Sequence, residues 1–513
     1  MLHEKILILD FGSKFSQTVA RKVRDLNVFS EIKSFKTSAD EILIQNYKGI
    51  IVTGPSKSIN FNNYKIDKKI LSSGIPILGI SSGAIILNTS LGGNCLPIQE
   101  DENNENFIDE VINITKGSQL FRKCDEKFNA FVDFQDKFTS LASELKPIAA
   151  NSKNDILAAE DTIKNYFAVL FHIEVNNSHN GDRIFKNFVK HICSCKGDFS
   201  ISSFVDESIE QIREKADGRK VLCALSGGVD SSVCAALVSK AIGKNLTCIF
   251  VDTGLMRKNE GNEVIDAFKD MDLNLIKIDA EDRFLKKLKD VIDPEQKRKI
   301  IGEEFIRVFE EEAKKIGEVD FLVQGTIYPD IIESGLDGAK LVKSHHNVGG
   351  LPEHVDFKEL IEPLRNLFKD EVRKVGLQLN LPESLVWRQP FPGPGLGIRV
   401  IGDLTKEKLD ILREADYIFR EEINKADLHK SINQYFVVLT NIKSVGVTKG
   451  KRTYENIAVL RAINTTDFMT SSYSKIPYEI LDRITARICS EVDGINRLVY
   501  DITNKPPATI EWE

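Results

Sequence analysis

Short apolar runs alternate with helical patterns along the first two hundred residues. Ile6–Leu9, Ile50–Val52 and Ile77–Ile80 are apolar runs of strand length, and segments with a helical pattern such as Phe15–Leu26 lie between them. A further apolar segment, Ala84–Leu87, follows the third run directly. Alternation of such strands with helices predicts an α/β domain with a largely parallel sheet.

A second domain of the same class is predicted from about residue 200. The pattern breaks at Cys195–Asp198, and an amphipathic helix at 204–215 leads into the apolar strand 220–225. Further strands at 246–251 and 321–324 are separated by helices rich in lysine and glutamate. This pattern is typical of a doubly wound α/β domain.

A third domain follows a loop rich in proline and glycine. Residues 388–397, with the sequence RQPFPGPGLG, contain too much of both for a helix or a strand. Beyond this loop the sequence predicts a helix at 406–424 and strands at 435–439 and 457–462, which is an α+β pattern. A chain of 513 residues has room for about three domains. We therefore expect domains at 1–199, 200–390 and 391–513.

Composition limits the partners and the location. The chain is 42% hydrophobic and 28% charged, and its net charge of −7 gives no overall attraction to nucleic acid or to an anionic membrane. No apolar run approaches the ~18–20 residues that a membrane-spanning helix needs. The eight cysteines are scattered, and the close pair Cys193 and Cys195 lacks the spacing of a metal site. We expect a cytoplasmic enzyme with reduced thiols and with no nucleic-acid or membrane partner.

A glycine-rich loop at the end of strand 220–225 predicts a phosphate site. The loop reads Ser226-Gly227-Gly228-Val229-Asp230-Ser231-Ser232, and an apolar helix begins directly after it. Small residues let the backbone approach a ligand, and the start of a helix offers unpaired N–H groups to an anion. The loop lacks the Lys-Ser/Thr ending of Walker-type sites. Asp230 either caps the helix or helps to hold a magnesium ion, and the sequence leaves both roles open.

This loop resembles the pyrophosphate loop of the N-type ATP pyrophosphatases, which split ATP between its α and β phosphates to adenylylate a substrate. Further motifs are similar to the GMP synthetases, and together they cover essentially the whole chain. They are the segments Val251–Leu255, Asp293–Gly302, Gln324–Asp330, Lys343–Pro352, the 388–397 loop and Lys505–Glu513.

The resemblance implies that ATP, with Mg²⁺, adenylylates xanthosine 5′-monophosphate (XMP) on its C2 oxygen, and that ammonia then displaces AMP to give GMP. It implies an ATP site at Ser226, Gly227, Gly228, Val229, Asp230, Ser231, Ser232 and Asp252. It implies catalytic roles for Asp230 and Lys343, and a lid that carries Lys343, His345 and His346. It implies an XMP site at Arg388, Gln389, Gly393, Lys505, Thr509, Ile510 and Glu511, and a homodimer formed by the third domain.

The first domain resembles a class I glutamine amidotransferase without its nucleophile. His172 and Glu174 match the family's base and the carboxylate that orients it, although a histidine in this apolar setting would by itself more often be structural. The family places a cysteine in a Gly-x-Cys-x-Gly turn that is followed two residues later by glutamine. This chain has Ser81 and Ile85 at those two positions.

The turn Gly79-Ile80-Ser81-Ser82-Gly83 also matches the Gly-x-Ser-x-Gly elbow of serine hydrolases. A serine hydroxyl is a far weaker acid than a thiol of pKa about 8.5, so it depends more on its base and oxyanion hole. The family's Ser-Gly-Gly-Pro oxyanion turn appears here as Val52-Thr53-Gly54-Pro55, with a glycine absent or displaced. We therefore predict a silenced glutaminase and free ammonia as the nitrogen donor. The alternatives are glutamine hydrolysis by Ser81, or a domain that only docks a partner or gates the lid.

Overall fold

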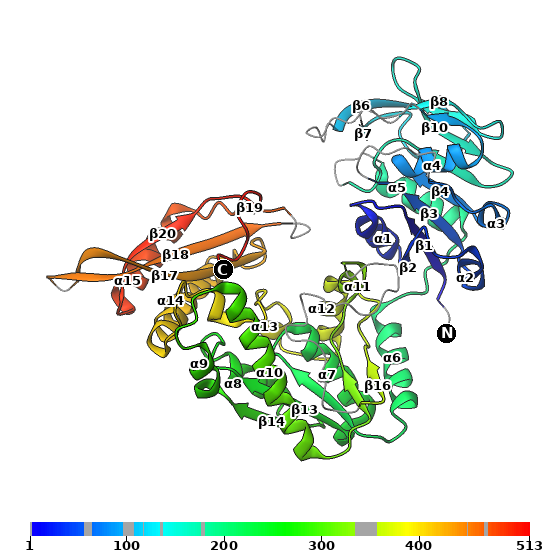
Figure 1. Ribbon diagram of the computed structural model, residues 1–513. Helices are drawn as coiled ribbons and strands as arrows, with labels where there is room; N and C mark the ends of the chain where they lie inside the picture. Colours follow the sequence, from blue (N-terminus) through cyan, green and yellow to red (C-terminus); the bar gives the residue numbers. More distant parts are fainter. Residues whose placement is uncertain are drawn as a thin grey trace. The chain divides into compact units, whose positions relative to one another are not determined.

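The computed structural model describes residues 3–55, 64–95, 107–115, 117–133, 137–175, 180–333, 357–448, 450–465 and 470–513. The chain divides into two compact units, of which the first extends to Phe204 and the second begins at Val205 (Figure 1). Each unit is described separately. The predicted division of the second unit near residue 390 stays a prediction.

The first unit is built on a nine-stranded sheet of order β2-β1-β3-β4-β11-β10-β9-β6-β7. The strands are β1 (Lys5–Asp10), β2 (Phe29–Ser34), β3 (Gly49–Thr53), β4 (Ile77–Ile80), β6 (Phe107–Ile114), β7 (Lys127–Asp133), β9 (Lys146–Ala150), β10 (Ile156–Asp161) and β11 (Tyr166–Val169). The half from β2 to β11 is parallel and the half from β11 to β7 is antiparallel. The expectation of a largely parallel sheet therefore fits one half only.

Helices cover the parallel half of this sheet (Figure 1). They are α1 (Ser16–Arg24), α2 (Ala39–Ile44), α3 (Lys68–Leu71), α4 (Ser82–Ser90) and α5 (Gly181–Lys186), the last continued by a π-helical turn at Asn187–Ile192. A small ribbon joins β5 (Asn94–Cys95) to β8 (Phe138–Ser140). Strands β3 and β4 are entirely buried, so the turn from β4 into α4 starts from a fixed base.

The second unit begins with a parallel sheet of order β14-β13-β12-β15-β16. Its strands are β12 (Val221–Leu225), β13 (Leu246–Asp252), β14 (Asn274–Asp279), β15 (Phe321–Val323) and β16 (Glu359–Ile361). The accompanying helices are α6 (Ile201–Ala216), α7 (Val229–Ile242), α8 (Glu260–Phe268), α9 (Glu281–Leu288), α10 (Pro294–Ile316), α11 (Tyr328–Glu333), α12 (Lys369–Gln378) and α13 (Glu383–Val386). Short 3₁₀ turns occur at Gly243–Asn245 and Gly395–Ile398.

An α+β region follows in the same unit. A long hairpin of β17 (Gln434–Thr448) and β18 (Lys451–Asn464) pairs with β19 (Ser472–Tyr473) and with β20 (Ile495–Asp501). Helices α14 (Lys406–Lys425) and α15 (Tyr478–Glu491) pack on its sheet. One hydrophobic cluster runs from Leu222 and Ile249 of the parallel sheet through Leu396 to Val437 and Leu460 of the hairpin. The two sheets of this unit therefore share a continuous core.

No helix among the described ranges is long and apolar enough to cross a membrane. No disulfide joins the cysteines in the described parts of the chain.

Candidate active sites

Ser81 lies at a strained turn between β4 and α4. Its backbone has φ +52° and ψ −124°, a conformation that L-residues rarely adopt and that is found mostly at functional sites. The turn is so tight that a Cβ on Gly83 would lie 2.0 Å from the Val52 carbonyl oxygen. A Cβ on Gly79 would lie 2.6 Å from the carbonyl oxygen of Gly83. The two glycines thus allow the nucleophile-elbow geometry that the sequence pattern predicts.

The elbow brings together three residues that are distant in sequence. Ser81 Oγ lies 3.3 Å from His172 Nε2, and His172 Nδ1 lies 2.6 Å from Glu174 Oε1. The exposed fractions of His172 and Glu174 are only 5% and 2%. The carboxylate favours the tautomer in which Nδ1–H donates to Glu174, and this leaves Nε2 to accept the Ser81 proton. The arrangement has the geometry of a serine-histidine-carboxylate triad.

The turn after β3 supplies few oxyanion donors. It packs closely on the start of α4, since a Cβ on Gly54 would lie 2.6 Å from the Gly83 backbone nitrogen. Pro55 has no N–H to donate, and its carbonyl oxygen accepts from Ser82 Oγ at 2.9 Å. Ala84 N–H already donates to the Ser81 carbonyl. The N–H groups of Ser82 and Gly83, at the first positions of α4, and that of Gly54 in the turn are therefore candidates to hold an oxyanion.

The phosphate loop follows β12 in the second unit. Gly227 has φ +78°, and α7 begins at Val229 with Gly228 as its N-cap. The last four residues of the predicted loop, Val229 to Ser232, thus form the first turn of the helix. Ser226 Oγ lies 3.1 Å from Ser231 Oγ, which also donates to the Gly228 carbonyl. The first N–H groups of α7 have no partner within the helix, and this is the arrangement that binds phosphate.

Asp230 lies in this first turn and does not occupy the N-cap position. Its Oδ2 forms an ion pair with Lys369, the first residue of α12. Its Oδ1 is buried and has no hydrogen-bond partner within the described residues. Asp252 ends the neighbouring strand β13, with one oxygen 3.6 Å from Lys277 Nζ. Lys369 is a site residue that the sequence interpretation missed, because its contact joins positions 139 residues apart.

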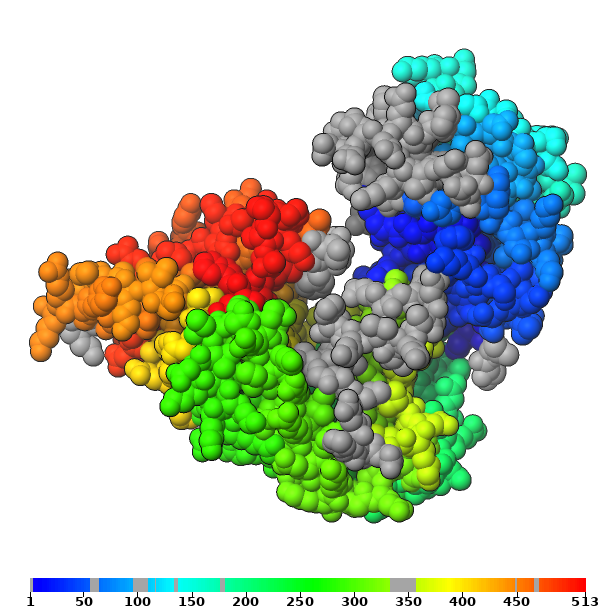
Figure 2. All heavy atoms as spheres, in the orientation of Figure 1, coloured from blue at the N-terminus to red at the C-terminus, as the bar shows by residue number. Residues whose placement is uncertain are grey.

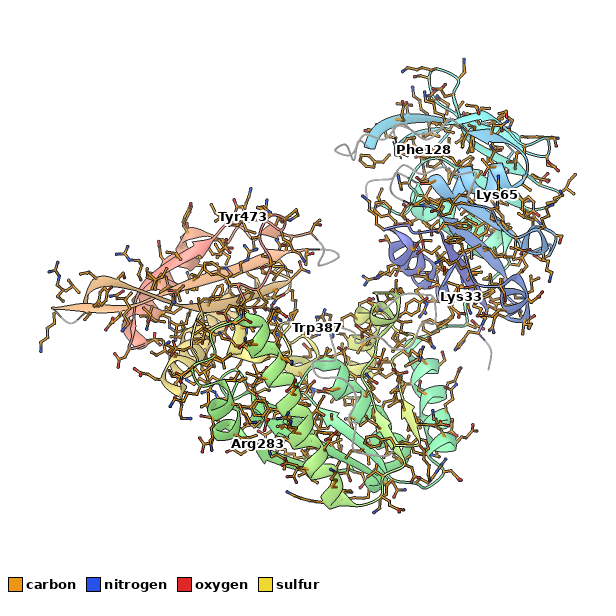
Figure 3. All side chains as sticks on the ribbon, viewed as in Figure 1. Lys33, Lys65, Phe128, Arg283, Trp387 and Tyr473 are labelled. Carbon is orange, nitrogen blue, oxygen red and sulfur yellow. The ribbon has the colours of Figure 1, made fainter. Side chains whose placement is uncertain are left out.

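Of two neighbouring predicted XMP residues, Arg388 contacts the phosphate loop and Gln389 contacts β17. Arg388 forms an ion pair with Glu260 and donates a hydrogen bond to the Gly227 carbonyl. Burial, and after it the nearby Arg257 and Arg420, lower the pKa of Arg388 to about 9. Gln389 Oε1 accepts from the Tyr435 N–H at 3.2 Å. Trp387, labelled in Figure 3, is the C-cap of α13 and directly precedes Arg388.

The C-terminal tail is held by buried cations. Glu511 accepts from Arg399 Nε at 3.1 Å and Nη2 at 2.8 Å, and also from Gln434. Arg461 donates to the carbonyls of Thr503 and Thr509. Ile510 packs on an apolar cluster of β17 and β18. The Lys505 backbone pairs with that of Ser471, and Gly393 is exposed in the turn after Phe391. The tail thus places its predicted residues on the hairpin, although the Glu511 carboxylate already has protein partners.

The predicted lid residues Lys343, His345 and His346 lie outside the described residues. Among the described parts of the chain, no cluster of three or more histidine, cysteine, aspartate or glutamate side chains could hold a metal ion.

Three family models match successive parts of the chain. The model of class-I glutamine amidotransferase matches residues 7–192, that of NAD synthase matches 201–307, and that of the GMP synthase C terminal domain matches 421–512. The first unit is therefore a class I glutamine amidotransferase fold. The second contains an NAD synthase-like ATP pyrophosphatase domain and a GMP synthase C-terminal domain.

Curated relatives match over their full length. Proteins named GMP synthase (glutamine-hydrolyzing) from Ruminiclostridium cellulolyticum, Acetivibrio thermocellus and Finegoldia magna are 56%, 54% and 53% identical to this chain. Each alignment covers 100% of both proteins. The chain therefore belongs to the GMP synthase family, ATP-using ligases that form a carbon–nitrogen bond.

Proposed function

We propose that this chain converts XMP to GMP through an adenyl-XMP intermediate and releases AMP and pyrophosphate. The contact that supports this most directly is the hydrogen bond from Arg388 to the Gly227 carbonyl. It joins the predicted XMP segment to the predicted pyrophosphate loop, and transfer of the α-phosphate of ATP to XMP requires these two sites to be adjacent. Ammonia then attacks C2 and AMP leaves.

The residues present fit Mg²⁺ bound together with ATP. Protein-bound Mg²⁺ usually takes one or two carboxylates along with substrate phosphates. Asp230 Oδ1 is a buried carboxylate oxygen that has no hydrogen-bond partner in the described parts of the chain, and it lies at the start of the helix expected to bind the phosphates. Lys369 offsets the charge of the other oxygen. In this arrangement Mg²⁺ would offset the charge of the departing pyrophosphate.

For the nitrogen donor, our first candidate is free ammonia. Ser81 offers a hydroxyl where the amidotransferase family has a thiol, the Val52–Pro55 turn has one glycine where the family's oxyanion turn has two, and Ile85 is buried where the family has a glutamine. Losing a single oxyanion donor alone costs roughly 3–4 kcal/mol of transition-state stabilisation. These three changes together would slow glutamine hydrolysis far more than ammonia-dependent synthesis.

The second candidate is glutamine hydrolysed by Ser81. The 3.3 Å contact of Ser81 with His172 and the 2.6 Å contact of His172 with Glu174 give the serine a base and the base an orienting carboxylate. The curated relatives carry "glutamine-hydrolyzing" in their names, so the comparisons favour this candidate over free ammonia. In this case glutamine would acylate the Ser81 oxygen and release its amide nitrogen as ammonia.

GMP formation from XMP, ATP and Mg²⁺ distinguishes the two donors when either glutamine or ammonium is the sole nitrogen source. Ammonium-dependent turnover with little glutamine-dependent turnover supports the first candidate. Comparable glutamine-dependent turnover that disappears in Ser81→Ala, while ammonium-dependent turnover persists, establishes the second. The role of the first unit as a docking or gating module stays a prediction, which deletion of residues 1–199 would test. A cytoplasmic location also stays a prediction.

We further propose that the chain forms a homodimer through the hairpin of β17 and β18. This hairpin exposes large apolar side chains, with Ile442, Val445, Val447 and Tyr454 at 60%, 51%, 74% and 65% exposure. Figure 2 shows the hairpin, in orange, projecting beyond the rest of its unit. Contiguous exposed apolar surface of this kind is typical of protein interfaces. Light scattering of Val447→Lys, compared with the unchanged chain, tests the assignment, and an unchanged mass would contradict it.

A further inference from the structure

Arg257 is a fully buried arginine that the proposed mechanism does not use. It follows Asp252 by five positions, in the segment between β13 and α8, and its exposed fraction is 4%. Burial of a guanidinium destabilises the fold unless acceptors and opposite charges surround it. The groups that surround Arg257 therefore indicate what it does.

The guanidinium of Arg257 holds the backbone of the predicted XMP segment. Nη1 donates to the Gln389 carbonyl at 3.2 Å and Nη2 donates to the Pro390 carbonyl at 2.9 Å. Its carbon lies 4.3 Å from the centre of the Phe391 ring, a cation–π contact. Three consecutive residues of the segment are thus fixed by one side chain.

Acidic groups on two elements hold the guanidinium in place. Glu260 of α8 lies 3.6 Å from Nη1, and its other oxygen accepts the Arg257 backbone N–H at 2.7 Å. Asp416 of α14 lies 3.8 Å from Nε. Glu260 is also the partner of Arg388, so one carboxylate orients both arginines. Burial, and after it the nearby Arg399, lowers the pKa of Arg257 to about 9.

The two segments also meet through their backbones. Leu396 N–H donates to the Leu255 carbonyl at 2.8 Å, and a Cβ on Gly395 would lie 2.4 Å from that oxygen. The segment that follows the ATP residue Asp252 and the segment that carries Arg388 and Gln389 are therefore interlocked.

We propose that Arg257 is a positioning residue for XMP, which sets the backbone of Gln389 and Pro390 and, through Glu260, the direction of Arg388. This inference rests on the proposed function, since it takes 388–393 as the XMP segment. Arg257 acts through these residues and is not itself a ligand of XMP. Only arginine presents two donors in a plane that can also stack on a ring, so lysine is a poor substitute here.

The test is ammonium-dependent GMP synthesis by the full chain with Arg257→Lys. We expect the KM for XMP to rise about tenfold or more while the KM for ATP stays within about twofold. Arg219→Lys is the matched control, because Arg219 also stacks on a phenylalanine, Phe321, and donates to backbone carbonyls, but on an exposed surface away from both segments. An equal rise of both KM values, or a fall in kcat alone, would overturn the proposal.

A second variant covers the case in which Arg257→Lys does not fold. Phe391→Leu keeps the two hydrogen bonds of Arg257 and removes the ring beneath it, and we expect it to raise the KM for XMP about threefold. No change in that KM would again contradict the positioning role. If the unaltered chain makes no GMP from XMP and ATP, the proposed function fails. If the unaltered chain makes GMP but the variants have an unchanged KM for XMP, only the inference about Arg257 fails.

Discussion

The Ser81 elbow of the first unit and the phosphate loop of the second have the same local design. In each, a buried parallel strand ends in a turn of small residues and a helix begins at once. They differ in which atoms would do the chemistry. The phosphate loop offers backbone N–H groups, which any sequence that folds into this turn supplies. The elbow has to present one particular side-chain atom.

This difference teaches that geometry and chemistry can be lost separately. In the first unit the strained φ of Ser81, the base and the orienting carboxylate are all in place, yet the nucleophile is an oxygen and the oxyanion turn has lost a glycine. In the phosphate loop, a turn that keeps its backbone shape keeps its N–H donors for phosphate. Four experiments would break or sharpen this contrast.

The largest effect is expected from Asp230→Ala. It removes the carboxylate that pairs with Lys369 and that we propose for Mg²⁺, and we expect GMP synthesis to fall by about 10³-fold or more with either nitrogen donor. Asp272→Ala is the control, since Asp272 is an exposed carboxylate near the far end of α7. Retained turnover in Asp230→Ala would show that backbone groups alone suffice at this loop.

Gly83→Ala tests how rigid the elbow is. The added Cβ would lie 2.0 Å from the Val52 carbonyl oxygen, so we expect the first unit to lose about 3 kcal/mol of unfolding free energy. Denaturant unfolding followed by hydrogen exchange in β3 and β4 measures it. Gly74→Ala is the comparison for a glycine with no atom near the added Cβ, although its φ of +78° brings some strain. Equal losses in the two variants would mean that the elbow is not tightly packed.

Ser81→Cys tests whether a thiol restores glutamine hydrolysis at an elbow whose geometry is intact. A thiol beside His172 ionises far more readily than a hydroxyl, so we expect glutamine-dependent GMP synthesis to rise about tenfold while ammonium-dependent synthesis is unchanged. The altered oxyanion turn and Ile85 stay, which limits the gain. The same change with His172→Ala added should abolish the gain. A fall in glutamine-dependent synthesis on Ser81→Cys would mean that the serine already works.

The smallest effect is expected on the stability of the second unit at acidic pH. The pKa of the fully buried Asp416 is lowered in the folded chain: burial alone would raise it, but Arg420, Arg257 and Arg399 more than compensate. A lowered carboxyl pKa stabilises the fold above the unfolded value of about 3.9 and loses that contribution as the pH falls below it. We expect the unfolding free energy of the second unit to drop by roughly 0.5 kcal/mol between pH 5 and pH 3.5. Asp416→Asn should be less stable at pH 7 and show a flatter pH profile; an unchanged profile would contradict the assignment.

The sequence predicted the fold classes well, because continuous apolar strands and amphipathic helices are local signals. The α/β and α+β classes are confirmed by the family matches. The antiparallel half of the first sheet was missed, since β10 and β11 are apolar strands whose direction depends on connections that the pattern does not show. The exact start of α7 was also missed, because serines and aspartate suit both a loop and a first helical turn.

The candidate site residues likewise fall into two groups, those in contiguous motifs and those whose partners are distant in sequence. The elbow and the phosphate loop are contiguous motifs, so their residues were found from the sequence. Lys369 and Arg257 reach their partners across 139 and 132 positions, and no local pattern distinguishes them from ordinary surface cations. A lysine directly after the apolar Leu367-Phe368 pair was the single hint for Lys369. The nitrogen donor stays open, because it depends on reactivity and not on arrangement.

The continuous core of the second unit has a practical consequence for dissecting this enzyme. Leu396 and Leu404, just beyond the proline-rich loop, pack in the same cluster as Leu222, Ile249 and Val437. Cleavage of the loop by a protease would leave two fragments, and truncation at residue 390 would leave one, each with leucine side chains of this cluster exposed to water. Such fragments would aggregate or, where both are present, reassociate. The parallel sheet and the hairpin sheet are therefore expected to fold and unfold as a single cooperative unit.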